Sequence, residues 1–125
     1  MTESFIIPYP SSDAGRKLWN RRYGLNAYWS GKHWSKRRED ADYWHRLVRA
    51  EMERQKVRRK PFENPAVLTF HFNDRLDCSN HAAMVKMIED AMKGRIIRED
   101  SRRWVKGIEI YFHDENYIRV TVSEV

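Results

Sequence analysis

The sequence predicts a small α+β domain in which two helices cover a mixed, mainly antiparallel sheet, in the order β-α-β-α-β-β. Three segments alternate apolar and polar residues, as strands with one buried face do, and two longer segments repeat apolar residues at helical spacing. Hydrophobic residues make up 41% of the chain, which predicts a folded core. Because 125 residues suffice for one core but not for two, we expect a single domain spanning residues 1–125.

The first half of the chain predicts a short strand, an irregular stretch and a long helix. Residues 4–8 form an opening strand, and residues 11–33 show no clean period and contain three glycines, which predicts an extended, partly ordered excursion. A helix is expected from Ser35 to about Lys56, and Pro61 lies just beyond its end. Its apolar stripe, near the 3.6-residue period, consists of Ala41, Trp44, Leu47, Val48 and Met52.

The second half predicts a strand, a helix and two more strands. Residues 66–72 alternate as a strand does. A helix follows with Asn80 as its N-cap and Gly94 as its stop, and its core-facing residues are Met84, Val85, Ile88, Ala91 and Met92. Residues 104–112 and 117–125 are then expected to form a closing hairpin. The inward-facing residues expected in this hairpin are Ile108, Ile110, Phe112, Ile118, Val120 and Val122.

The charge of the chain favours a polyanionic partner. The formal net charge is +6, the pI is about 9.6, and residues 16–60 hold fifteen Lys or Arg against five Asp or Glu. Such clustering is typical of proteins that bind nucleic acid. A membrane surface is a weaker alternative, because the aromatic residues of this half are not sorted onto one face.

The single cysteine, Cys78, excludes an intrachain disulfide and a zinc site built from several cysteines. Lying between Asp77 and Ser79, it is expected to point opposite to them, into the core. The chain has no apolar run of about 18 residues and no signal-peptide pattern at its start. A soluble cytoplasmic protein in a reducing compartment, without membrane contact, is therefore expected.

Carboxylates gather around the second helix of this otherwise basic chain. Asp77 and Ser79 lie between a strand and the helix, and Lys86 and Asp90 are four residues apart, so they share a helix face. Asp100 lies on the loop that enters the next strand, which could bring it beside Asp77. Oxygen ligands of this kind suit Mg²⁺, which can activate water for phosphodiester hydrolysis. The alternative is a solvated acidic helix start in which Lys86 simply pairs with Asp90.

The order of these residues resembles the RusA-type Holliday junction resolvases. The resemblance rests on the motif Asp77-Cys78-Ser79-Asn80, on Lys86, on Asp90-Ala91-Met92 and on Glu99-Asp100-Ser101. The opening Phe5-Ile-Ile-Pro8 strand, the strand before the motif and the segment from Trp104 to Val125 are similar to the family's strands, and the Asn26-to-Trp44 region is similar to that of phage-borne members. The resemblance thus spans nearly the whole chain.

The resemblance implies a homodimeric endodeoxyribonuclease that resolves four-way or branched DNA in recombination and repair, with Mg²⁺ or Mn²⁺ as cofactor. Asp77 and Asp100 match metal-binding aspartates, Lys86 matches the catalytic lysine, and Asn80 closes the motif on the DNA side. Ser79 stands at the metal position where the family has a second aspartate. Because a neutral hydroxyl is a poor Mg²⁺ ligand, a catalytically degenerate branched-DNA-binding protein is the alternative.

The basic half also carries most of the aromatic residues, including four of the five tryptophans. Lys and Arg would hold phosphates there, while aromatic rings stack on unpaired bases at a junction. The expected DNA contacts are Lys32, Lys36, Arg37, Arg38 and Arg75. The alternative is that Trp44 and other rings belong to the core, as we expect for Trp44 itself, and that the charges solvate a helix.

Overall fold

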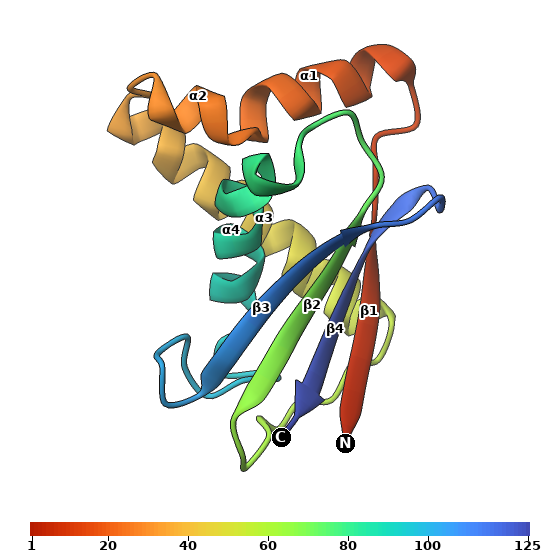
Figure 1. Cartoon of the computed structure of the whole chain (residues 1–125), viewed down its shortest axis with the longest axis vertical. Coiled ribbons are helices and arrows are strands. Elements are labelled where there is room, and N and C mark those ends of the chain that lie inside the picture. The colour runs from red at the N-terminus through yellow and green to blue at the C-terminus, as the bar shows by residue number, and fades with distance from the viewer.

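The computed structural model describes all 125 residues and confirms the α+β class, with one four-stranded sheet and helices on one side of it (Figure 1). The strands lie in the order β1-β4-β2-β3; β1 and β2 each pair antiparallel with β4, whereas β2 and β3 are parallel. Their bounds are β1 Thr2–Pro8, β2 Ala66–Phe72, β3 Val105–Phe112 and β4 Tyr117–Glu124. The helices are α1 Asp13–Tyr23, α2 Leu25–Trp29, α3 Trp34–Arg54 and α4 Ala82–Met92, with a short 3₁₀ turn, η1, at Cys78–His81.

The expectation of only two helices is wrong, because residues 11–33 form α1 and α2 rather than an extended excursion. Ser12 caps α1, since its hydroxyl accepts a hydrogen bond from the Gly15 backbone N–H at 3.0 Å. Gly24 separates the two helices where the chain turns tightly. A Cβ there would lie 2.8 Å from the Asn20 carbonyl oxygen, so only glycine fits the turn.

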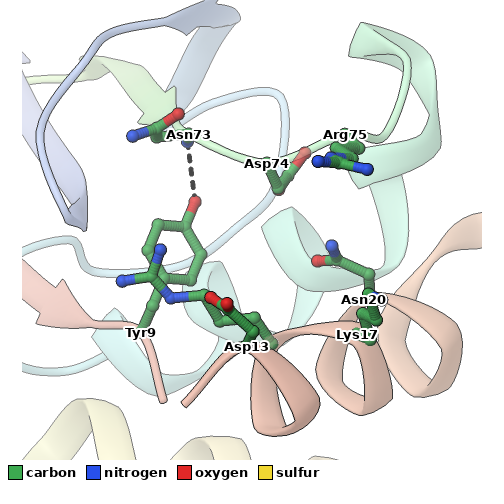
Figure 2. Close-up of a pocket in the computed structure, with 8 residues that line it drawn as sticks. Tyr9, Asp13, Lys17, Asn20, Asn73, Asp74 and Arg75 are labelled. Atoms are coloured by element: carbon green, nitrogen blue, oxygen red, sulfur yellow. Dashed lines mark hydrogen bonds between the residues drawn. The ribbon is translucent and has the colours of Figure 1, made fainter. Parts of the chain in front are cut away.

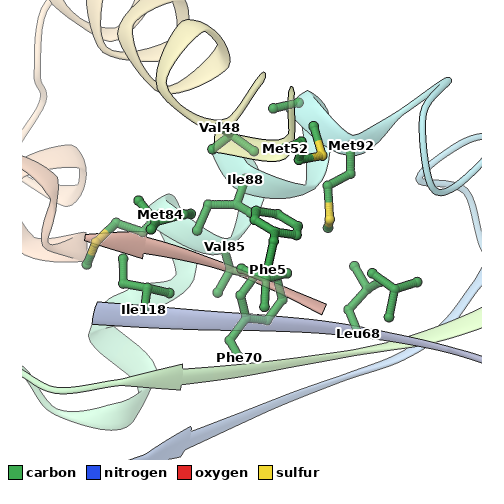
Figure 3. Packing of buried hydrophobic residues seen from close by; sticks show 14 of the residues in the cluster. Phe5, Val48, Met52, Leu68, Phe70, Met84, Val85, Ile88, Met92 and Ile118 are labelled. Carbon is green, nitrogen blue, oxygen red and sulfur yellow. The ribbon is translucent and has the colours of Figure 1, made fainter. Parts of the chain in front are cut away.

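The core lies between the sheet and the pair α3 and α4, as Figure 3 shows. From α3 it receives Trp44, Val48 and Met52, and from α4 it receives the five residues that the sequence predicted: Met84, Val85, Ile88, Ala91 and Met92. The sheet contributes one face, with Phe5, Ile7, Leu68, Phe70, Phe72, Ile118, Val120 and Val122. Two members of the predicted α3 stripe differ, since Ala41 is exposed and Leu47 is only half-buried. No helix is long and apolar enough to cross a bilayer.

The predicted closing hairpin is wrong. Strands β3 and β4 are not neighbours, because β2 lies between them and pairs with both. The segment from β2 through α4 to β3 is therefore a β-α-β crossover, which parallel neighbours require. The inward set predicted for β4 is confirmed, but Ile108 and Phe112 of β3 remain 44% and 49% exposed.

The two edges of the sheet are treated differently. At the β1 edge, the Gln55 side chain imitates a neighbouring strand: its amide donates to the Ile6 carbonyl at 2.8 Å and its oxygen accepts from the Ile6 N–H at 2.9 Å. At the β3 edge, the one side chain that bonds the strand is Cys78, whose thiol donates to the Ile110 carbonyl at 3.4 Å. Cys78 is thus exposed beside β3, and its expected place in the core is wrong.

A buried carboxylate joins the three N-terminal helices. Asp40 of α3 is fully buried and accepts hydrogen bonds from Arg22 of α1 at 2.8 Å, from Tyr28 of α2 at 2.6 Å and from Lys32. Burial raises the pKa of Asp40, but these three donors outweigh burial and leave the pKa below its ordinary value. These hydrogen bonds to Asp40 fix α1 and α2 across the end of α3 (Figure 1).

Candidate active site

Three carboxylates and a lysine meet beside α4. Ligand oxygens of Glu89, Asp90 and Asp100 all lie within 4.8 Å of one another. The Lys86 ammonium contacts all three: it pairs with Asp100, lies 3.2 Å from Asp90 and lies 3.5 Å from Glu89. We call Glu89, Asp90 and Asp100 the carboxylate group. The helical spacing of Lys86, Glu89 and Asp90 places them on adjoining faces, and the loop after α4 brings Asp100 back to them.

The electrostatics of the carboxylate group reflect this crowding. The side chain of Glu89 is only 7% exposed, and this burial raises its pKa. The negative charges of Asp100 and Asp90 raise the pKa of Glu89 further. The hydrogen bond from Lys86 lowers the pKa of Asp100 and in turn raises the pKa of Lys86. Lys93 lies 3.6 Å from Asp90 and 3.7 Å from Asp100, so two ammonium groups face three carboxylates and offset their charge only in part.

Glu89 was not among the predicted site residues. The spacing of its neighbours on the helix could have indicated its burial, because Val85 lies four positions before it, Met92 lies three positions after it, and both are buried. A glutamate at that position lies close to the core. Burying its negative charge there is costly unless a cation compensates the charge.

The motif segment Asp77–Asn80 lies at the other end of α4, and Asp77 is outside the carboxylate group. Asp77 and Ser79 are both exposed at the start of η1, where the Asn80 N–H donates to the Asp77 carbonyl at 2.9 Å. Asn80 is thus a member of the 3₁₀ turn, and its expected role as the N-cap of the helix is wrong, since His81 precedes α4. The structure therefore unites Lys86, Asp90 and Asp100 but does not add Asp77 and Ser79 to their group.

His81 anchors the motif segment to the sheet. Its Nε2 lies 2.8 and 2.9 Å from the two carboxylate oxygens of Asp74, and its Nδ1 lies 2.9 Å from the Cys78 carbonyl oxygen. The ring stacks on Phe72 with the ring centroids 4.0 Å apart. Both side chains of the pair are buried. His81 and Asp74 thus position the backbone on which Asp77 and Ser79 stand.

The donor set of the carboxylate group fits a hard divalent cation. Mg²⁺ takes oxygen ligands and usually one or two carboxylates together with waters and substrate phosphates. Three carboxylates at this spacing meet that requirement.

The predicted DNA-contacting side chains differ in how free they are. Arg38 and Arg75 are exposed and make no hydrogen bond or ion pair with the protein, and Lys36 is exposed with a weak pairing to Glu39 at 3.4 Å. Arg37 is exposed but donates to the Tyr28 carbonyl at 3.0 Å. The Lys32 ammonium is bound to Asp40 and, at 2.8 Å, to the Arg22 carbonyl, which gives it a structural role.

Two tryptophans stand free among these cations. Trp29 at the end of α2 is 82% exposed and Trp34 at the start of α3 is 67% exposed, with the His33 ring 5.6 Å from that of Trp34. Exposed rings of this size beside Lys and Arg can stack on nucleobases. Trp19 and Trp44, in contrast, are buried and pack against each other with their ring centroids 4.8 Å apart. The burial of Trp44 confirms the core role predicted for it.

Comparison of the chain with models of known protein families finds no match, and comparison with curated proteins finds none either.

Proposed function

We propose that this protein is a structure-selective endodeoxyribonuclease that cuts four-way or branched DNA with Mg²⁺ or Mn²⁺. The observation that carries the proposal is the meeting of Glu89, Asp90 and Asp100 around Lys86 on a protein with a net charge of +6. Lys86 and Lys93 offset the three carboxylates only in part, and the remaining negative charge would repel a polyanionic substrate unless a cation lay between them. The sequence resemblance to RusA-type resolvases points to the same chemistry.

In this proposal each residue has a stated task. Glu89, Asp90 and Asp100 would hold the cation, and Lys86 would offset the charge that builds on the scissile phosphate. When bound, the cation would supply an activated water and stabilise the leaving oxygen. Trp29 and Trp34 would stack on bases unpaired at the branch point, and Lys36 and Arg38 would hold the adjoining phosphates.

A homodimer is part of the proposal, because resolving a two-fold symmetric junction needs two cuts and one chain offers one carboxylate group. The β3 edge supports it. This strand lacks a neighbour on its outer side and carries Ile108, Tyr111 and Phe112 with 44% to 50% of their surface exposed. An apolar, unpaired edge of this kind is ready to pair with a second copy.

The proposal is tested by incubating the purified protein with a labelled four-way junction, with and without Mn²⁺. We expect Mn²⁺-dependent cuts in opposite strands, and we expect Asp100→Asn to lose them while keeping DNA affinity, because the variant removes a charge that repels phosphate. Asp114→Asn, which changes an exposed carboxylate in the turn between β3 and β4, is the matched control and should cut as the wild type does. Intact junctions in every lane, with tight binding, would contradict nuclease activity.

A second candidate is a branched-DNA-binding protein that has lost catalysis. It is favoured by Ser79, a neutral residue in the motif, and by the position of Asp77 outside the carboxylate group. Ser79→Asp separates the two candidates. If the native chain binds junctions without cutting and this variant cuts, the binding protein is the better description.

A further inference from the structure

A polar cavity of about 460 Å³ opens between α1 and the loop that follows β2 (Figure 2). It is lined by Tyr9 from the segment after β1, by four residues of α1 and by three residues of the loop; the last two sets are Asp13, Arg16, Lys17 and Asn20, and Asn73, Asp74 and Arg75. Figure 2 shows Asn20 and Lys17 on the helix side, facing Asp74 and Arg75 on the loop side. The loop wall ends only two residues before Asp77 in the chain, but the cavity does not include the carboxylate group.

The frame of this cavity is held rigidly. The Tyr9 hydroxyl accepts a hydrogen bond from the Asn73 backbone N–H at 2.8 Å, and the Asn73 side chain donates to the Glu115 carbonyl at 2.9 Å. Arg16 donates to the Pro10 carbonyl at 3.1 Å and lies over the Tyr9 ring, 5.9 Å from its centroid. These contacts join β1, α1 and the loop, so the cavity is formed before any ligand arrives.

Four polar side chains in this frame are left without a partner. Lys17, Asn20, Arg75 and Asp13 make no hydrogen bond or ion pair through their side chains. Asp74, in contrast, has both carboxylate oxygens within hydrogen-bond distance of His81 Nε2, so they are already engaged within the wall. Asp13 is the other carboxylate of the wall and offers an acceptor at the helix start.

This combination selects a class of ligand. With one hydrophobic residue among its eight, the cavity suits an ionised ligand rather than an apolar one, and its volume lies within the range of about 300 to 1,000 Å³ of small-molecule sites. Lys17 and Arg75 offer free cations for a phosphate, and Arg's planar fork matches phosphate oxygens. The Asn20 amide can donate to and accept from the edge of a base, and the Asp13 carboxylate can accept a hydrogen bond from an amino group of a base.

We infer that this cavity binds one nucleotide, with its phosphate at Lys17 and Arg75 and its base edge at Asn20 and Asp13. The inference rests on the proposed function in one respect: it assigns the nucleotide to a strand of the branched DNA. This nucleotide would lie beside the loop Asn73–Arg75, which precedes the Asp77 segment in the protein chain. The same phosphate chemistry could come from a free nucleotide, and the experiment distinguishes the two sources.

The first measurement is junction binding over a salt series by fluorescence anisotropy, for the wild type and for the double variant Lys17→Ala/Arg75→Ala. We expect roughly tenfold weaker binding, and a slope of log affinity against log salt that is shallower by about 1 for each phosphate that the variant no longer neutralises. The control is Arg59→Ala/Lys60→Ala, which removes the same charges from the segment between α3 and β2, away from α1 (Figure 1). Equal weakening in both double variants would overturn the inference.

The second measurement does not depend on DNA binding. Wild-type protein is titrated with a deoxynucleoside monophosphate and, separately, with inorganic phosphate, while amide NMR signals are followed. We expect saturable shifts at Asn20, Asn73 and Arg75 that are larger with the nucleotide. Nucleotide binding without junction binding would refute the proposed function but leave the cavity assignment intact, with a free nucleotide as ligand. No shift with either probe, or an unchanged salt slope when junctions do bind, would refute the cavity assignment alone.

Discussion

His81 is the side chain whose removal should most strongly test how the motif segment is held. It is fully buried, it bonds both oxygens of Asp74 and the Cys78 carbonyl, and it stacks on Phe72. His81→Ala leaves the Asp74 carboxylate buried with only the Leu76 N–H, at 3.0 Å, as its partner. Truncating a buried aromatic ring and leaving a buried hydrogen-bond acceptor without its partner together cost about 3–5 kcal/mol. Because small domains are stable by only about 5–15 kcal/mol, we expect a marginal protein.

The assay is urea unfolding followed by circular dichroism, with the free energy of unfolding extrapolated to water. Asp74→Asn keeps an acceptor for the ring in the same place, so it should cost only about 1–3 kcal/mol. His45→Ala, at an exposed position of α3, should change the free energy of unfolding by less than about 0.5 kcal/mol. A cost below about 1 kcal/mol for His81→Ala would show that the contacts between His81 and Asp74 do not hold the motif segment in place.

Other predictions concern the carboxylate group and the open edge. Because the pKa of Glu89 is raised by folding, its contribution to stability is present below the ordinary glutamate pKa and is lost as pH rises through the raised value. Glu89→Gln should therefore raise the Tm by a few degrees at pH 7 and leave it unchanged near pH 3, as calorimetry can show; a lower Tm at pH 7 would contradict this. If the proposed homodimer forms, Ile108→Lys should convert it into monomers in sedimentation experiments, with Lys106→Ala as the control on the same strand, and a dimer that persists would exclude the β3 edge as its interface.

The strands were predictable to within a few residues, but their arrangement was not. Strand β2 coincides with the predicted 66–72 segment, because Leu68, Phe70 and Phe72 alternate with more polar residues. The same alternation in β3 and β4 suggested a hairpin, since consecutive strands are usually neighbours. Periodicity shows which side chains share a face but not which strand lies beside it. The exposure of Ile108 on an edge strand therefore could not be read from the sequence.

The helices α1 and α2 were missed because their glycines were interpreted as signs of irregular structure. Gly24 marks a boundary between helices rather than a break in order, and Gly15 lies in the first turn of α1. What stabilises these short helices is tertiary, namely the packing of Trp19 and Tyr23 on Trp44 and the bonds to Asp40. Local sequence patterns contain no information on such contacts.

The candidate site was predictable where it depends on helical spacing. Lys86 and Asp90 share a helix face, as their four-residue separation predicted, and they form the ion pair that the alternative of a solvated helix start expected. Asp100 joins them from the loop. The expected approach of Asp100 to Asp77 depended on how the loop folds back, and Asp100 meets Glu89 and Asp90 instead. The second carboxylate on the helix was overlooked because Glu89 lies next to the apolar stripe.

The most direct test of the proposed metal site is a crystal structure of the protein with Mn²⁺, in which anomalous scattering locates the ion. We predict one strong peak within ligand distance of Asp100 and at least one of Glu89 and Asp90, and no such peak in crystals of Asp100→Asn. An absence of bound Mn²⁺ in the wild type, or a peak at Asp77 with none at the carboxylate group, would contradict it.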